Sequence, residues 1–344
     1  MKTFSTKEEI KAGVVGYGGA YTIGKHHITQ IEESGMKLSA VAETDPERLE
    51  AAKEDFPGIR TFSSLSEMLE LSEDVNLVIV LTPHNTHAPL ALEALNAGRH
   101  VVSEKPMAVT TEECDSMIET AEKNGLMVTA YHNRHWDGCI MNALETIRTG
   151  SIGDVVRIEA HMGSWGVPVQ TWRSSRSRSG GILYDWGVHL LEYTFQIIEE
   201  DIAEVSGYMK EGFWKNDTPW EEDSNEDEGF AVVRYANGCW SSLSISSIDS
   251  KPKEGQVEIT GTQGTLVFSN RDWKMITHKG NTTVTAAGPN PESQWGSFYR
   301  NVAGFLTGRE DLIISPEYAR RPIHVLDLAR KSADQGKALK PIYP

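Results

Sequence analysis

The sequence predicts two domains: a doubly wound α/β domain with a parallel sheet, then an α+β domain with a large, mostly antiparallel open sheet. Three observations support this prediction. Short apolar runs alternate with amphipathic stretches up to about residue 131. A glycine-rich turn directly follows the first of these runs. Beyond His132, apolar runs succeed one another without intervening helices, which is typical of antiparallel strands.

Composition and charge restrict the class of protein. The 344 residues are enough for two domains with sizeable cores. With 33 basic and 49 acidic residues the formal net charge is −16, and such a surface repels nucleic-acid phosphates and anionic lipids. We therefore expect neither nucleic acid nor a membrane among its partners.

The cysteines and the first residues indicate a reducing compartment. Cys114, Cys139 and Cys239 lie far apart, without the spacing of a disulfide framework or a thiolate metal site, so we expect no metal. The first eleven residues contain no apolar signal segment, and no apolar run approaches the roughly 18 residues that a membrane helix needs. Together these observations favour a cytoplasmic location.

The first half predicts five strands of a parallel sheet, joined by helices. Strands buried on both faces appear as continuous apolar runs, and amphipathic helices show apolar residues at i, i+3 and i+4. The predicted strands are 12–16, 38–43, 77–81, 101–102 and 126–130, and the predicted helices are 46–55, 64–71, 88–97, 111–124 and one that contains 26–31.

The second half predicts two helices and a succession of strands. Asn237-Gly238 has the composition of a tight hairpin turn. The stretch 216–228 holds seven acidic residues and is interpreted as a solvated loop. A loop rich in Gly, Ser, Arg and Trp is expected before Gly181. The predicted helices are 139–149 and 184–198, and the predicted strands are 155–161, 203–210, 230–235, 239–245, 256–260 and 265–268.

We accordingly place residues 1–131 in the first domain and 132–344 in the second. For the C-terminal helix, packing back on the first domain is an alternative.

The glycine-rich turn Gly16-Tyr17-Gly18-Gly19 indicates a nucleotide site. Its glycines allow a pyrophosphate to approach the backbone, and the following helix offers free N–H groups to the anion. The fingerprint G-x-G-x-x-G is incomplete, because Tyr21 occupies the third glycine position and Gly24 comes three residues later. A tight turn without a ligand is the alternative.

Two further strand ends support a dinucleotide site. The second strand ends at Glu43, where a carboxylate accepts both ribose hydroxyls and repels a 2′-phosphate, which favours NAD over NADP. The third strand leads into Thr82, Pro83 and His87, at the edge where open parallel sheets bind ligands. For His87, capping the following helix is an equally good interpretation.

Two pairs of residues are candidates for the catalytic groups. Glu104 and Lys105 follow the fourth strand, and a lysine there can neutralise an alkoxide, although Lys-Pro is often only a surface turn. Asp185 and His189 are spaced i, i+4 and share a helix face, so they form either a general-base pair or an ordinary surface pair.

The loop before Gly180 is a candidate substrate-binding segment. Polyol pockets combine polar groups with aromatic walls, and Trp172 and Arg173 supply both, with Arg134 near the domain junction. Packing between domains is the alternative for the tryptophan. The arginines at 173, 176 and 178 indicate either an anionic sugar substituent or a solvated basic loop.

From about Lys11 to Gly336 the chain resembles the Gfo/Idh/MocA oxidoreductases, the family of glucose–fructose oxidoreductase and inositol dehydrogenase. The resemblance is specific because a Glu-Lys-Pro segment and an Asp-x-x-x-His helix occur in this order and spacing. The matching segments are 16–19, 43–46, 82–83 with His87, 97–106, 133–134, 180–189, 237–238 and 261–266.

The resemblance implies a Rossmann domain that binds NAD and a sheet domain that forms homodimers or homotetramers. It implies that His189 takes the hydroxyl proton, that Asp185 holds the hydroxyl or orients the imidazole, and that Lys105 stabilises the alkoxide. The implied activity is NAD-dependent oxidation of a sugar, cyclitol or related polyol. An enzyme that retains and recycles NAD on a glycoside, and a non-enzymatic sensor, are the alternatives; the intact catalytic set argues against the sensor.

Overall fold

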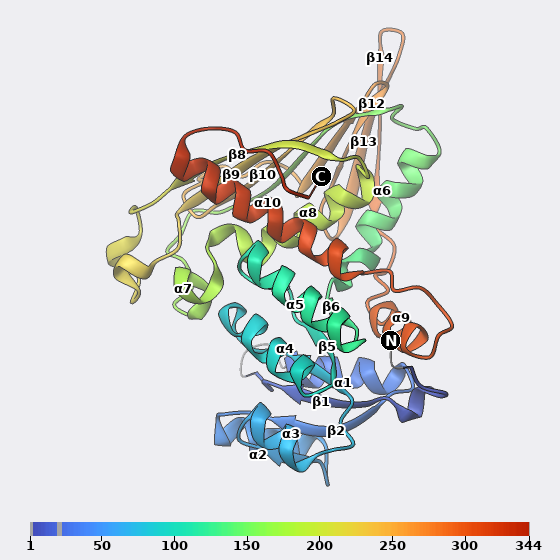
Figure 1. Cartoon of the computed structure of the whole chain (residues 1–344). Coiled ribbons are helices and arrows are strands. Elements are labelled where there is room, and N and C mark those ends of the chain that lie inside the picture. The colour runs from blue at the N-terminus through green and yellow to red at the C-terminus, as the bar shows by residue number, and fades with distance from the viewer. Residues whose placement is uncertain (1–2, 19–22, 344) are drawn as a thin grey trace. The chain divides into compact units, whose positions relative to one another are not determined.

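The computed structural model describes residues 3–18 and 23–343 and divides the chain into two compact units (Figure 1). The first unit comprises Met1–His132 with Gly296–Arg320, and the second comprises Asn133–Trp295 with Arg321–Pro344. Over the described residues, no helix combines the length and hydrophobicity needed to cross a bilayer.

The first unit is built on a six-stranded parallel sheet in the order β3-β2-β1-β4-β5-β6. The strand order reverses between β1 and β4, which creates the switch point at which doubly wound sheets bind ligands. This confirms the expected fold class. The strands are β1 Lys11–Val15, β2 Lys37–Ala42, β3 Arg60–Phe62, β4 Leu77–Val80, β5 His100–Ser103 and β6 Val128–Ala130.

Two helices of the first unit begin at residues whose side chains cap them. Asp45 caps α2 by accepting a hydrogen bond from the Glu47 amide, with Pro46 at the first helical position. Thr110 and Glu113 form a capping box at the start of α5. The helices are α1 Ile23–Glu33, α2 Pro46–Asp55, α3 Leu65–Leu71, α4 His87–Asn96, α5 Thr111–Asn124 and α9 Ser297–Leu306, with short 3₁₀ turns at Lys7–Glu9 and His84–Thr86.

Helix α9 groups with the first unit, whereas the sequence placed all of 132–344 in the second domain. Its buried face carries Phe298, Tyr299 and Val302. The Phe4 amide also donates to the carbonyl of Leu306 at 2.9 Å. An amphipathic pattern shows that a helix has a buried face but does not identify what covers it. The distant partner therefore escaped prediction.

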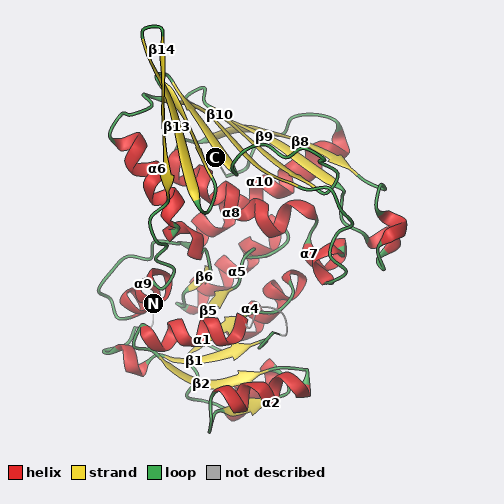
Figure 2. Cartoon of the chain, turned by 180° about the vertical axis from the view of Figure 1, so that it is seen from behind, coloured by secondary structure: helices red, strands yellow, loops and turns green. Residues whose placement is uncertain are grey.

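The second unit contains an eight-stranded sheet in the order β14-β13-β12-β11-β7-β10-β9-β8 (Figure 2). All its neighbours are antiparallel except β7 and β10, which confirms the mostly antiparallel open sheet. The strands are β7 Val155–Gly163, β8 Ile202–Lys210, β9 Glu228–Tyr235, β10 Trp240–Ser246, β11 Val257–Gly261, β12 Gly264–Phe268, β13 Asp272–Lys279 and β14 Thr282–Pro289.

Helix α8, Ile182–Ile197, is packed against this sheet. A Cβ added at Gly187 would lie 3.0 Å from Leu243 of β10, so the glycine allows the close approach. The unit's other helical segments are α6 Gly138–Arg148, α7 Arg176–Ser179, α10 Pro316–Gln335, which begins in the first unit, and the 3₁₀ turns Asn133–Trp136, Trp172–Ser174, Lys215–Asp217 and Glu221–Asp223.

The prediction that 216–228 is a solvated loop is wrong for its last part. Glu226 and Asp227 are 1% and 2% exposed. Both oxygens of Asp227 accept backbone hydrogen bonds, from Phe213 at 2.7 Å and from Trp214 at 2.9 Å. Glu226 accepts one from Ile182 at 2.9 Å. A carboxylate can be buried when its charge is satisfied in this way, and composition alone does not reveal the donors.

A salt-bridge cluster on the first unit predicts a pH-dependent stability. Partial burial alone would raise the pKa of Asp74, but hydrogen bonds from Ser39 and Arg60 and the Arg60 charge lower it to about 2. Its stabilising contribution is therefore present above about pH 4 and is lost as the pH falls through 2. We expect Asp74→Asn to lower the free energy of unfolding by about 1 kcal/mol at pH 7, after allowance for screening of a side chain one-third exposed.

Chemical denaturation of the full chain between pH 7 and pH 2 measures this effect. The difference between the two proteins should narrow below about pH 4, while Glu73→Gln, an exposed neighbour, should have no comparable effect. A difference of equal size at pH 7 and pH 2.5 would exclude the ion pairs as its source.

Candidate active site

The glycine turn and Glu43 form one structure at the carboxyl ends of β1 and β2. One Glu43 oxygen accepts from the Tyr17 amide at 2.8 Å and from the Gly18 amide at 3.5 Å. The other accepts from the Asp45 amide at 3.1 Å. The carboxylate is only 7% exposed, so it is fixed beside the turn. Gly19, the fourth residue of the predicted turn, lies outside the described residues.

The turn leaves no room for a side chain at Gly16 or at Gly18. Gly16 and Gly18 have φ angles of 88° and 76°. A Cβ at Gly16 would lie 3.0 Å from the carbonyl oxygen of Leu81, and one at Gly18 would lie 2.6 Å from Ile23. These positions require glycine both for conformation and for space. The backbone is therefore open to close approach by a ligand.

Gly24 performs the packing role that the fingerprint assigns to its third glycine. A Cβ there would lie 2.6 Å from the Tyr17 ring, and its amide donates to the Tyr17 carbonyl at 3.1 Å. The Tyr17 hydroxyl donates to Asp55 at 2.6 Å, which anchors this side chain at the end of α2. Burial and the Asp55 contact raise the pKa of Tyr17. Tyr17 therefore takes part in the turn through its backbone amide and not through its side chain.

A cavity of about 390 Å³ opens where β1, β2 and β4 end. Its lining is mostly apolar and includes the Glu43 carboxylate and several hydroxyl side chains. A cavity with mostly apolar surface and a few polar groups is typical of a small-molecule site. The lining residues are Val15, Gly16, Ala42, Glu43, Thr44, Ser63, Ser64, Leu65, Thr82, Pro83, Thr86, Pro89 and Leu90.

His87 is a buried brace for two loops of the first unit. Its Nδ1 lies 2.7 Å from the carbonyl oxygen of Pro106, and its Nε2 lies 2.8 Å from that of Thr82. Burial lowers the pKa of this imidazole. His87 does not line the cavity at the ends of β1, β2 and β4. The geometry therefore supports an indirect role, in which His87 fixes the loop that carries Thr82 and Pro83.

Glu104 holds the backbone of Lys105 at the end of β5. One Glu104 oxygen accepts from the Lys105 amide at 2.7 Å, and the other lies 3.1 Å from Nε2 of His27. The other nitrogen of His27 lies 2.6 Å from the Tyr299 hydroxyl. Burial alone would raise the pKa of Glu104, but His27 and the Lys105 charge hold it below its ordinary value. This network, which the sequence did not reveal, fixes the backbone at Lys105.

In the second unit, α8 carries Asp185 and His189 one turn apart. Nε of Arg173 lies 3.8 Å from Asp185, and its guanidinium stacks on Trp172 at 4.5 Å. The structure therefore brings the expected substrate loop together with the first turn of α8. The Trp186 ring packs edge-on against His189, which is only 5% exposed.

Arg134 is held beside the same helix. Its guanidinium lies 4.6 Å from the centre of the Trp186 ring and donates to Asp137 at 2.9 Å. Asp137 also accepts from the Tyr193 hydroxyl and from the Trp295 indole. The sequence did not identify these partners, because Asp137 resembles a helix cap before α6 and Trp295 is far away in the chain.

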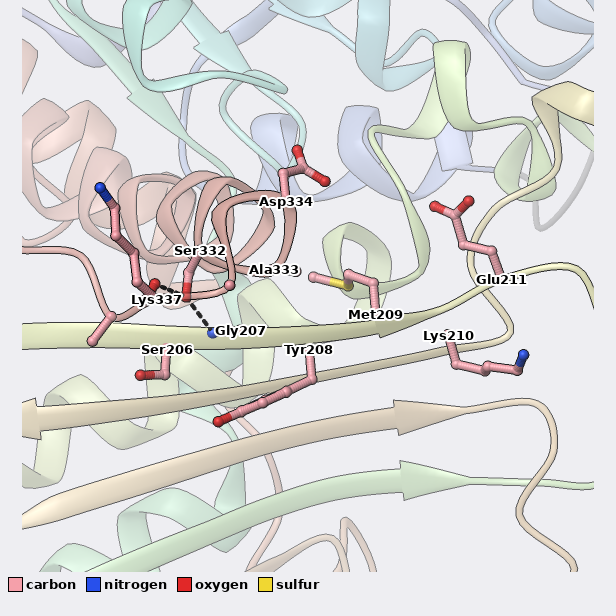
Figure 3. Close-up of a pocket in the computed structure, with 12 residues that line it drawn as sticks. Ser206, Gly207, Tyr208, Met209, Lys210, Glu211, Ser332, Ala333, Asp334 and Lys337 are labelled. Atoms are coloured by element: carbon pink, nitrogen blue, oxygen red, sulfur yellow. Dashed lines mark hydrogen bonds between the residues drawn. The ribbon is translucent and has the colours of Figure 1, made fainter.

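The predicted catalytic residues are divided between the two units. Lys105 belongs to the first, and Asp185 and His189 to the second. None of them lines the cavity of about 700 Å³ between β8 and the end of α10 (Figure 3). There the Gly207 amide donates to the Ser332 hydroxyl at 3.0 Å, a contact that joins strand and helix. This second cavity contains none of the predicted site residues.

Two family models cover most of the chain. Residues 10–132 match the model described as an oxidoreductase family with an NAD-binding Rossmann fold. Residues 145–341 match the model of the C-terminal alpha/beta domain of an oxidoreductase family.

Individual relatives agree with these models. The scyllo-inositol 2-dehydrogenase (NADP(+)) IolW of Bacillus subtilis (strain 168) is 29% identical over 203 residues, which cover 59% of this chain and 55% of the relative. The myo-inositol 2-dehydrogenase of Thermotoga maritima is 25% identical over 76% of this chain and 75% of its own. The chain spans about half the length of several curated relatives that it matches. An NAD-binding protein from Listeria innocua has the same fold, with a TM-score of 0.83, 24% identity and 97% coverage of both chains.

Proposed function

Because this chain belongs to the Gfo/Idh/MocA oxidoreductase family, we propose that it is an NAD-dependent dehydrogenase of a secondary hydroxyl on a sugar, cyclitol or related polyol. The observation that carries the proposal is the start of α8, where Asp185 pairs with Arg173 and shares a helix face with His189 one turn later. The names of the two inositol dehydrogenases among its relatives support a polyol substrate.

The proposed roles follow from the chemistry of each group. His189 takes the proton from the substrate hydroxyl through a ring nitrogen, since imidazole exchanges protons near neutral pH. Asp185 orients the imidazole that receives this proton, since a hydroxyl has only one hydrogen to donate. Lys105 stabilises the negative charge that develops on the oxygen. The nicotinamide, when bound, takes up the hydride. Ketone reduction uses the same residues in reverse.

Trp172, Arg173 and Arg134 are proposed to bind the rest of the polyol. The Trp172 ring offers an apolar face to a sugar ring, and the two guanidinium groups offer donors to its hydroxyls. Arg173 is about one-third exposed and Arg134 about one-fifth, so both retain solvent-facing surface.

Measuring retained cofactor and turnover together tests this function. The purified protein is denatured and assayed for released NAD(H), and polyols are screened for growth of absorbance at 340 nm. Little released cofactor, with NADH accumulating on one polyol, is the expected result. Stoichiometric retained NAD without net NADH from any polyol would contradict free exchange and direct the screen to glycosides.

Glu43 is proposed to favour NAD over NADP, because its charge repels a 2′-phosphate. We expect Glu43→Gln to weaken NAD binding about tenfold and to narrow the preference over NADP. The effect should include loosening of the turn, because the carboxylate also holds the Tyr17 and Gly18 amides. Fluorescence titration with NADH and NADPH measures both constants.

Glu47→Gln, an exposed change of the same kind on α2, is the matched control and should leave both constants unchanged. Tighter binding of NADPH than NADH by the unaltered protein would refute the assigned role of Glu43. The NADP-dependent relative makes this a stringent test.

A further inference from the structure

The acidic segment 223–227 is a binding partner of the loop that leads into α8. The Asn225 side chain donates to the carbonyl oxygen of Arg173 at 2.7 Å and accepts from the Ser179 hydroxyl at 3.0 Å. The next residue, Glu226, accepts from the Ile182 amide. Neighbouring residues of one segment thus hold the substrate loop and the start of the helix.

Glu226 and Arg330 together enclose the peptide units at Gly180–Ile182. One Glu226 oxygen lies 2.9 Å from the Ile182 nitrogen, and the other lies 2.5 Å from the Arg330 guanidinium. The same arginine nitrogen donates to the Gly180 carbonyl at 2.9 Å. Burial alone would lower the pKa of Arg330, but the Glu226 charge raises it above its ordinary value.

Gly181 lies between these two contacts, and the Glu226 and Arg330 side chains pack closely against its backbone. Gly181 has a φ of 123°, and a Cβ there would lie 2.2 Å from Arg330 and 2.7 Å from Glu226. The N-terminus of α8 has no side-chain cap from its own N-cap residue. Its first amide depends instead on a side chain 44 positions away.

We propose that Glu226 and Arg330 are positioning residues that hold Gly180–Ile182, and thereby set the placement of Asp185 and His189 for proton transfer. The proposal rests on the proposed function of those two residues. Asp185 lies in the first turn of α8 and His189 one turn later, so a shift at Ile182 moves both side chains relative to the substrate. Small displacements of reacting groups reduce rates strongly.

Glu226→Gln tests these contacts with little change in the shape of the side chain. A carboxylate has two acceptor oxygens, whereas a carboxamide has one acceptor and one donor, so either Ile182 or Arg330 loses its partner. We expect kcat for the polyol, per NADH-binding site, to fall at least tenfold while the Kd for NADH stays within twofold. We also expect amide hydrogen exchange in the peptide 180–186 to accelerate at least tenfold. A merely structural role would lower the number of NADH-binding sites without changing turnover per site.

Glu222→Gln is the matched control, because Glu222 directly precedes the acidic segment 223–227 but is 85% exposed. It should change neither exchange nor turnover. Arg330→Lys provides the same two measurements if Glu226→Gln does not accumulate as folded protein, since the shorter lysine side chain does not bring its ammonium to the place where one Arg330 nitrogen contacts both Glu226 and Gly180. Unchanged exchange at 180–186, or unchanged turnover per site, overturns the proposal. If exchange accelerates but the unaltered protein oxidises no polyol, Glu226 and Arg330 do hold Gly180–Ile182, and it is the proposed function that fails.

Discussion

Replacing His189 with alanine is expected to lower polyol turnover by on the order of 10²-fold or more, with the affinity for NADH unchanged. The imidazole is the group proposed to take the hydroxyl proton, and it is buried beside Trp186 on α8. The residues that line the cavity at the ends of β1, β2 and β4, which we propose to bind the cofactor, belong to the other unit, so cofactor binding should persist. Steady-state kinetics and an NADH titration of the same preparation measure both quantities.

His161→Ala is the matched control for this substitution. His161 is similarly buried in the second unit, on β7, where its Nε2 lies 3.1 Å from the Lys253 carbonyl oxygen. It should affect stability rather than turnover per NADH-binding site. Turnover of the His189 variant within twofold of the unaltered protein would remove His189 from the mechanism.

Replacing Lys105 with alanine is expected to reduce kcat by on the order of 10²–10³-fold, because it removes the cation proposed to stabilise the alkoxide. Glu104 would keep its contact with the backbone amide at position 105 and with His27, so the local structure should survive. Lys105→Arg restores the charge but not the shape, and we expect only partial recovery. The measurements are kcat and KM for the polyol, with NADH binding as the index of folding.

Lys123→Ala on α5 is the control for loss of a positive charge from the same unit, since Lys123 is exposed. It should leave kcat unchanged. If Lys105→Ala raised KM alone, with kcat intact, the lysine would bind substrate without stabilising the reacting oxygen.

The first unit could be predicted largely from sequence. Buried parallel strands leave continuous apolar runs, and the runs at 12–16, 38–43 and 77–81 correspond to β1, β2 and β4. Strand β3 was missed because it has three residues, none of them fully buried. The chemically distinctive residues lie next to recognisable local signals, a glycine turn or a strand end.

The last two strands of the second unit, β13 and β14, could not be predicted in the same way. Residues of β13 and β14 are exposed or half-buried throughout, so no apolar alternation marks them. Their hydrogen bonds to one another and to β12 create the strands. A strand whose stability comes from pairing leaves little trace in its own side chains.

The sequence by itself therefore determined the two fold classes, the glycine turn and the order of the candidate catalytic residues, since each depends on neighbours within a few positions. Only the tertiary structure decided that α9 belongs to the first unit, that His87 braces two loops, and that Glu226 is buried against α8. The physical reason is the same in each case. Arg330 and Gly180 are 150 positions apart, and a polar side chain becomes structural only when folding brings a distant donor or acceptor to it.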